Sequence, residues 1–265
     1  MEIMRTIRHV SPGVALLAAC LVPALPAGAA DWSLSAGMDY SNGRYGGGQA
    51  TETWSVPLIL KWEGERSTLK ITLPWVRVTT PSGGNIIDVD PGGQPVYDGS
   101  GPRSTEEGMG DLGISYAWSV WPRPLYGFLL DLGAKAKLAT ADKAKGLGSG
   151  KNDYSVQADM YYLVGALTPF FTAGYRMPGD PAGLSLRNQR YGTLGLGYKL
   201  SSADSAGLMW DWRQASRTGS EGAKEATIYW VRKFSPDFKL QTYALRGFSA
   251  VSPDWGFGFL ATYAY

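Results

Sequence analysis

Apolar and polar residues alternate along most of the chain beyond residue 30, and the stretch 255–265 shows this best. Its odd-numbered positions are all aromatic or alanine, while its even positions are mostly small. Because successive side chains of a strand point to opposite faces, this pattern predicts a strand with one continuous apolar and aromatic face. A strand of that length, aromatic at both ends, is typical of an outer-membrane barrel. A soluble sandwich could bury it, but would usually end in a polar tail.

The same alternation predicts about twelve strands, with ten or fourteen as alternatives. In 125–140, for example, Phe128, Leu130 and Leu132 share one face, while Asp131 and Lys135 share the other. The inward face of 224–234 and 238–248 stays undecided, because both faces carry apolar residues. The expected strands are 32–40, 51–62, 67–79, 111–121, 125–140, 153–164, 168–176, 188–200, 205–216, 224–234, 238–248 and 255–265.

The connections between these strands alternate strictly between long and short. Outer-membrane barrels have long external loops and short periplasmic turns, and an even strand number places both termini on the periplasmic side. We therefore expect an all-β, transmembrane, antiparallel up-and-down barrel with both termini periplasmic. The long connections are 41–50, 80–110, 141–152, 177–187, 217–223 and 249–253, and the short ones are 63–66, 122–124, 165–167, 201–204 and 235–237.

Residues 1–30 have the anatomy of a cleaved signal peptide. A positive start at Arg5 and Arg8 precedes an apolar segment and the small-residue pattern at 27–29. The expected organisation is thus a signal peptide over 1–30 and one barrel over 31–265. A lipoprotein signal processed at Cys20 is the alternative, although the apolar run before this cysteine is short.

Charge and residue usage exclude several function classes. Without residues 1–30 the chain has 23 basic and 22 acidic residues, so it lacks the basic excess of nucleic-acid-binding proteins. Its only histidine, His9, and its only cysteine, Cys20, both lie in the signal. An outer-membrane hydrolase usually needs a histidine base. We therefore expect no enzyme activity and no catalytic residues, with a Ser–Lys or paired-carboxylate mechanism only formally open.

Two motifs could suggest ligands but fit poorly. The glycines at 108, 110 and 113 have the spacing of a dinucleotide fingerprint, yet they precede an alternating strand rather than a helix. They are better explained by a bend or close approach at a barrel rim. Asp88, Asp90 and Asp98 could bind calcium, but the full calcium-loop spacing is missing. We expect no cofactor and no metal.

Charged residues on the faces opposite the apolar stripes are the candidates for lining the lumen. Lys or Arg facing lipid at the midplane costs about 2–4 kcal/mol, so these residues should point inward. They could form a permeation path of mixed charge or a salt-bridged plug; twelve strands enclose more than side chains alone fill, which favours the path. The candidates are Asp131, Lys135, Lys137, Asp153, Asp159, Lys199, Asp211 and Arg213.

Several short motifs, in order along nearly the whole mature chain, resemble a known family. They are Ser55-Val56-Pro57-Leu58, Leu73-Pro74-Trp75-Val76, Gly108-Met109-Gly110-Asp111-Leu112-Gly113, Asp153-Tyr154, Gly247-Phe248-Ser249 and Ser252-Pro253-Asp254-Trp255-Gly256-Phe257-Gly258. The chain resembles the outer-membrane transporter-like family associated with the meta-cleavage pathway of phenol degradation. The resemblance implies a monomeric or weakly oligomeric barrel that passes small, often hydrophobic or aromatic compounds.

The sequence therefore predicts a cell outer-membrane channel that passes small solutes by diffusion. Its expected partners are the lipid bilayer, a small-molecule solute and, during biogenesis, periplasmic chaperones and the barrel-assembly machinery. A structural or adhesive barrel acting through its external loops is the alternative. Trp54, Trp62, Trp75, Trp121, Tyr126 and Tyr175 could stack aromatic solutes, but an interfacial girdle explains most of them. Whether 80–110 gates the lumen stays open.

Overall fold

The computed structural model describes residues 31–82, 86–89, 95–97, 99–121, 123–181 and 183–265. The expected signal peptide and Cys20 therefore lie outside the described residues. The strands and one short helix are β1 (Asp31–Gly43), β2 (Thr51–Glu63), β3 (Ser67–Pro81), β4 (Ile86–Val89), β5 (Pro95–Tyr97), β6 (Arg103–Met109), β7 (Leu112–Ser119), β8 (Phe128–Leu138), η1 (Lys143–Lys145), β9 (Asp153–Tyr162), β10 (Leu167–Met177), β11 (Gln189–Lys199), β12 (Asp204–Arg213), β13 (Ala223–Lys233), β14 (Phe238–Gly247) and β15 (Trp255–Ala264).

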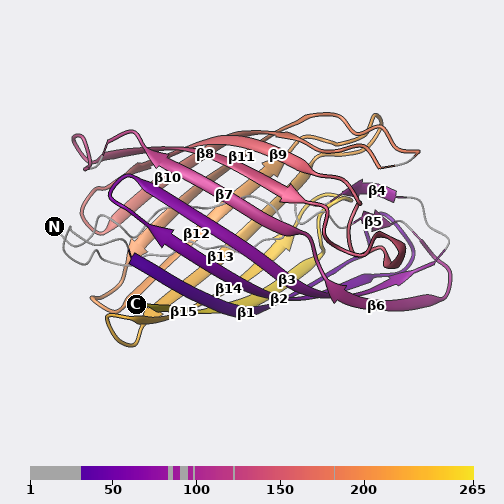
Figure 1. Ribbon diagram of the computed structural model, residues 1–265, viewed down its shortest axis with the longest axis horizontal. Helices are drawn as coiled ribbons and strands as arrows, with labels where there is room; N and C mark the ends of the chain where they lie inside the picture. The colour runs from indigo at the N-terminus through magenta and orange to yellow at the C-terminus, as the bar shows by residue number, and fades with distance from the viewer. Residues whose placement is uncertain (1–30, 83–85, 90–94, 98, 122, 182) are drawn as a thin grey trace.

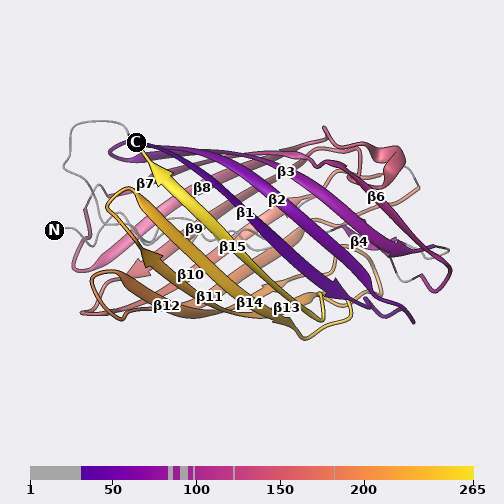
Figure 2. The same cartoon turned by 90° about the horizontal axis from the view of Figure 1, so that it is seen from below.

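The described strands form a closed antiparallel barrel, as the alternation predicted. Each strand pairs with its neighbours in chain order, and β1 pairs with both β2 and β15, which closes the sheet. β6 and β7 pair with consecutive parts of β3 and act as one interrupted strand, so the wall has 12 strands. The strands are strongly tilted against the long axis of the barrel (Figures 1 and 2). Among the described residues, no helix is long and apolar enough to cross a membrane.

The expected connection 80–110 was wrong in part, because much of it is strand. Residues 103–109 extend the barrel wall as β6, opposite 75–81 of β3, while β4 and β5 form a separate hairpin. The interruption falls at the glycine motif: a side chain at Gly110 would come within 2.8 Å of Val76 and 2.9 Å of Pro74. This close approach agrees with the expectation that the glycines of the motif allow a bend or close approach at the barrel rim.

Short and long connections lie at opposite ends of the barrel. The short connections that follow β2, β7, β9, β11 and β13 share one end with Tyr265. The Tyr265 amide donates to the Trp32 carbonyl at 2.9 Å. The longer connections share the other end with β4, β5 and η1 (Figure 1). The start of β1 and the end of β15 therefore both lie at the short-turn end.

The outer face of the wall is apolar, with aromatic residues near both ends. Leu194 and Ile228, for example, are 62% and 65% exposed. At the short-turn end Phe128 stacks on Tyr162 with ring centroids 4.4 Å apart, and at the other end Tyr40 contacts Trp54 at 4.6 Å. An apolar band between two aromatic girdles is the surface that a transmembrane barrel presents to lipid.

Candidate solute path through the barrel

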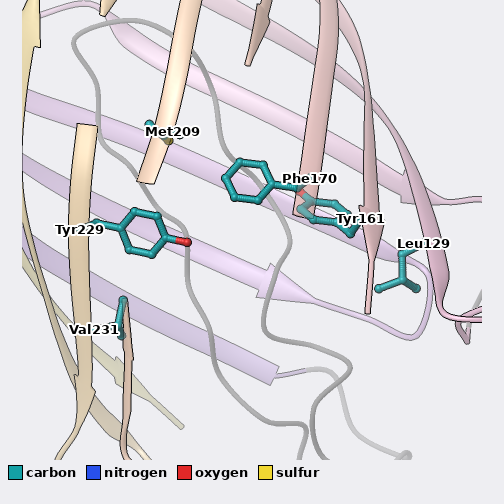
Figure 3. Close-up of a cluster of buried hydrophobic side chains, with 6 residues drawn as sticks. All are labelled: Leu129, Tyr161, Phe170, Met209, Tyr229 and Val231. Atoms are coloured by element: carbon teal, nitrogen blue, oxygen red, sulfur yellow. The ribbon is translucent and has the colours of Figure 1, made fainter. Parts of the chain in front are cut away.

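The eight predicted lumen residues all lie in strands, on the face opposite the exposed apolar side chains. Six of them are buried, Lys135 is half-buried and Lys199 is exposed at the end of β11, next to the turn 200–203. In a closed barrel the face away from the surroundings is the inner face, which is also where Figure 3 places the inward aromatic residues. The buried ones are Asp131, Lys137, Asp153, Asp159, Asp211 and Arg213.

Lys137 and Asp153 belong to an ion-pair network at the long-loop mouth. Lys137 Nζ lies 2.8 Å from Asp111 Oδ2 and 3.6 Å from Asp153 Oδ2, and Arg176 Nη2 lies 2.6 Å from the same Asp153 oxygen. All four side chains are almost fully buried. Asp111 and Arg176 were not among the sequence candidates. Their part in the network follows from the register, which stacks β7, β8, β9 and β10 side by side.

This network also holds the connection 139–152 in place. Asp111 Oδ1 accepts the amides of Thr140 and Ala141 at 3.0 and 2.9 Å, and Lys137 Nζ donates to the Lys151 carbonyl at 2.9 Å. In the same connection Leu147 is buried against the inward-facing Val76 and Val78 of β3. We call Asp111, Lys137, Asp153 and Arg176 the mouth network; its contacts fix a loop to the wall.

Farther from this mouth, two carboxylates are held on the wall by hydroxyl groups of the neighbouring strand. The Thr172 hydroxyl donates to Asp159 Oδ1 at 2.6 Å, and the Thr193 hydroxyl donates to Asp211 Oδ1 at 2.5 Å. Each pair is also a direct cross-strand pair in the register. The threonines therefore fix where these two negative charges lie.

Inward aromatic rings lie flat across glycines instead of filling the lumen. A Cβ on Gly174 would fall 2.1 Å from the ring of Tyr191, and one on Gly195 would fall 2.1 Å from the ring of Phe170. Tyr191 reaches across Gly174 to donate its hydroxyl to Gln157 Oε1 at 3.0 Å. Because these rings run along the wall, a glycine on the adjacent strand leaves the space inside the barrel wider.

A third such pair joins the two ends of the sheet. Tyr243 of β14 donates its hydroxyl across Gly258 of β15 to Asp39 Oδ1 of β1 at 2.5 Å. A Cβ on Gly258 would lie 2.4 Å from that carboxylate oxygen. This contact spans the strand that closes the barrel.

The buried apolar side chains form a band along the inner face rather than a separate core. Figure 3 shows Tyr161 and Phe170 of the adjacent strands β9 and β10, and Tyr229 of β13, directed to the interior. The full band consists of Leu129, Tyr161, Phe170, Met209, Tyr229 and Val231. The sequence left Tyr229 undecided, because its strand is apolar on both faces.

The calcium reading rested on Asp88, Asp90 and Asp98; Asp90 and Asp98 lie outside the described residues. Within the described part of the chain, no group of three or more His, Cys, Asp or Glu is arranged to hold a metal ion. The dinucleotide spacing at 108–113 joins two strands and opens no helix. The structure thus gives the inner face both polar and apolar side chains.

Comparison with solved structures places this architecture among porins. The chain is similar to the KdgM porin, with a TM-score of 0.56 and 8% identity over 88% of this chain and 99% of that one. It is also similar to the NanC porin, with a TM-score of 0.55 and 9% identity over 86% of this chain and 97% of that one. No family model and no curated protein matches the chain. The fold is therefore that of porin-like barrels.

Proposed function

We propose that this protein is an outer-membrane channel through which small solutes diffuse. The observation that carries the proposal is the division of the wall. Its outside is apolar and aromatic, whereas charged and hydroxyl side chains line its inside from β1 to β15, alongside one apolar band. Charged side chains avoid the lipid face of a barrel, and a polar interior is the usual lining of a water-filled passage. The porin fold supports the same conclusion.

The finer parts of the proposal rest on the sequence. Residues 1–30 act as the cleaved export signal, the short-turn end faces the periplasm, and folding uses periplasmic chaperones and the barrel-assembly machinery. Small aromatic compounds are the favoured solutes through the family resemblance to phenol-degradation transporters. Among the predicted inner-face charges, Asp131, Lys135, Asp159 and Asp211 line the path.

Solute flux into liposomes tests this function. The mature chain is refolded, inserted into vesicles, and compared for entry of small aromatic acids and of sugars of similar size. We expect both to enter faster than into protein-free vesicles, and the aromatic acids faster than the sugars. Faster sugar entry would reject the aromatic preference alone, while no entry through a folded barrel would favour a structural or adhesive barrel.

A matched pair of variants on β11 shows whether solutes pass through the lumen. Gly195→Leu needs the space that the Phe170 ring occupies, so it pushes bulk inward and should slow entry severalfold. Leu194→Phe changes the adjacent, outward-facing residue and should leave entry unchanged. Equal slowing by both variants would mean that flux reports barrel stability and not the width of the lumen.

A further inference from the structure

Cross-strand pairing organises the inner face into rows. Residues directly opposite each other on adjacent strands point to the same side of the sheet, so pairing can be followed from strand to strand across the wall. Because barrel strands tilt by about 35–45°, such a row climbs the wall as a spiral from one mouth toward the other. A row is thus a continuous track along the lumen.

One row is basic and carries no acidic residue. It runs from β1 to β11 through consecutive register pairs on seven inter-strand steps of the described wall. Its charged members are all cations. Its other members are serines and, at one end, a glutamine. The basic row consists of Ser33, Lys61, Lys70, Ser115, Lys135, Ser155, Arg176 and Gln189.

A second row is acidic and carries no basic residue. It runs in the same direction from β7 to β14, with threonines between its carboxylates. Two of those threonines donate hydrogen bonds to Asp159 and Asp211, which fixes the charges on the row. The acidic row consists of Ser119, Asp131, Asp159, Thr172, Thr193, Asp211, Glu225 and Gly247.

The two rows run side by side without merging. On β8 they are represented by Lys135 and Asp131, four residues apart, which is about 13 Å at roughly 3.3 Å per residue. Gly133 lies between them, in a row that also holds Gln157, Gly174 and Tyr191. Over β8, β9 and β10 this intervening row carries no charge, whereas farther along it holds Glu63 beside Lys61 and Arg213 beside Asp211. Lys70 nevertheless interacts electrostatically with Asp159 of the acidic row.

The basic row is hollowed at its middle. Its ends are tied by ion pairs, Lys61 with Glu63 at 2.7 Å and Arg176 with Asp153 at 2.6 Å. Between these ends a surface hollow is lined by Lys70, Ser115, Lys135, Thr68 and Gln157, among others. A water-sized hollow therefore lies next to the two central lysines.

We propose that the lumen favours zwitterionic small molecules, which travel with the carboxylate along the basic row and the ammonium group along the acidic row. This inference rests on the proposed channel function and names a substrate class for it. A lumen with low-dielectric walls focuses the field between separated charges of opposite sign. A dipolar solute gains from both rows at once, whereas a neutral solute gains from neither.

Segregated charges also predict how ions pass. Anions follow one row and cations the other, so the unaltered channel should discriminate weakly between potassium and chloride. Removing the positive charges of one row should then leave the opposing row dominant. Exposed charges are screened by salt over about 10 Å at 0.1 M and about 3 Å at 1 M, so the zwitterion preference should fall as salt rises.

The test combines flux and reversal potential on the unaltered barrel and three variants. Lys70→Gln with Lys135→Gln removes the two central cations of the basic row, and Asp131→Asn with Asp211→Asn removes two of the four carboxylates of the acidic row. Entry of 6-aminohexanoate is compared with entry of arabinose, and reversal potentials are read in a potassium chloride gradient. Lys224→Gln, which removes an exposed cation from outside both rows, is the matched control.

We expect 6-aminohexanoate to enter severalfold faster than arabinose, and either double substitution to abolish that advantage while arabinose entry persists. Reversal potentials should shift toward cation selectivity for the lysine variant and toward anion selectivity for the aspartate variant. Arabinose entry with no zwitterion advantage, or no selectivity shift, overturns the inference and leaves the channel standing. If neither solute enters, both the zwitterion inference and the proposed channel function are overturned. If a variant fails to fold, raising salt on the unaltered barrel decides alone, since an advantage that survives 1 M salt is not electrostatic.

Discussion

Lys135 and Lys137 lie two residues apart on the same face of β8, yet they belong to different regions. Lys137 sits in the mouth network, where two carboxylates, a serine hydroxyl and a backbone carbonyl surround its ammonium group. Lys135 is half-buried beside the hollow of the basic row, with Lys70 across it. The two lysines have the same charge and the same place in the alternation, yet Lys137 anchors a loop and Lys135 lines the lumen.

The difference teaches that partners from other strands, and not the residue itself, decide the role of an inner-face charge. A buried ion in a closed network loses its water and regains that energy only from fixed partners, so removing one partner is costly. A half-buried charge next to open space keeps access to water, and its removal costs little stability. Substitutions in the mouth network should therefore change stability more than selectivity, and substitutions beside the hollow should change selectivity more than stability.

Asp153→Asn should produce the largest effect, because Asp153 accepts from Arg176 and also faces Lys137. Breaking a buried ion pair by removing one partner destabilises by about 3–5 kcal/mol. We expect a clearly lower urea midpoint for unfolding of the barrel in detergent micelles. Tyr154→Phe, at the neighbouring outward position, serves as the control and should leave the midpoint unchanged. An Asp153→Asn barrel as stable as the parent would remove the mouth network from the structural account.

Period-two alternation was enough to place nearly every strand of the wall, because a wall between lipid and a polar lumen imposes that period on each strand. The alternation did not predict β6, because this segment is polar on both faces over Arg103-Ser104-Thr105-Glu106-Glu107. Only its pairing with β3 shows that it is a strand. Such a segment extends the wall beyond the apolar belt, where nothing demands an apolar outer face.

The undecided strands β13 and β14 show a second limit. Tyr229 and Tyr243 point inward, an orientation that the alternation left undecided. Each lies against a glycine of the adjacent strand, Gly207 and Gly258. The packing of a tyrosine on a glycine of the next strand depends on the register between the strands. The sequence of a single strand does not reveal this register. The same holds for Asp111 and Arg176 in the mouth network.

Gly174→Ala tests this use of glycine in the lumen and should have an intermediate effect. The new methyl group would overlap the Tyr191 ring, which must leave the wall and lose its hydrogen bond to Gln157. Overpacking of this kind costs about 1–3 kcal/mol. We expect a modest drop in unfolding midpoint together with lower single-channel conductance, as the ring moves into the lumen.

Adding Tyr191→Ala to Gly174→Ala removes the displaced ring and should restore the conductance, though not the lost hydrogen bond. Conductance that stays low in the double variant would mean that the ring does not define the width of the path at this level. The stability and conductance readouts thus separate packing on the wall from the opening it leaves.

Lys135→Glu should change stability least and still alter ion selectivity. Lys137→Glu, two residues along the same strand, serves as the comparison. A substitution at a half-buried site outside the mouth network should change the free energy of unfolding by no more than about 0.5 kcal/mol. We expect the Lys135→Glu barrel to keep its urea midpoint while its reversal potential in a salt gradient moves toward cation selectivity. Lys137→Glu puts a third carboxylate beside Asp111 and Asp153, so its midpoint should fall before any change in selectivity can be measured. Equal midpoints with equal shifts for the two variants would mean that both lysines face one common path, and the division of β8 into an anchoring and a conducting region would have to be given up.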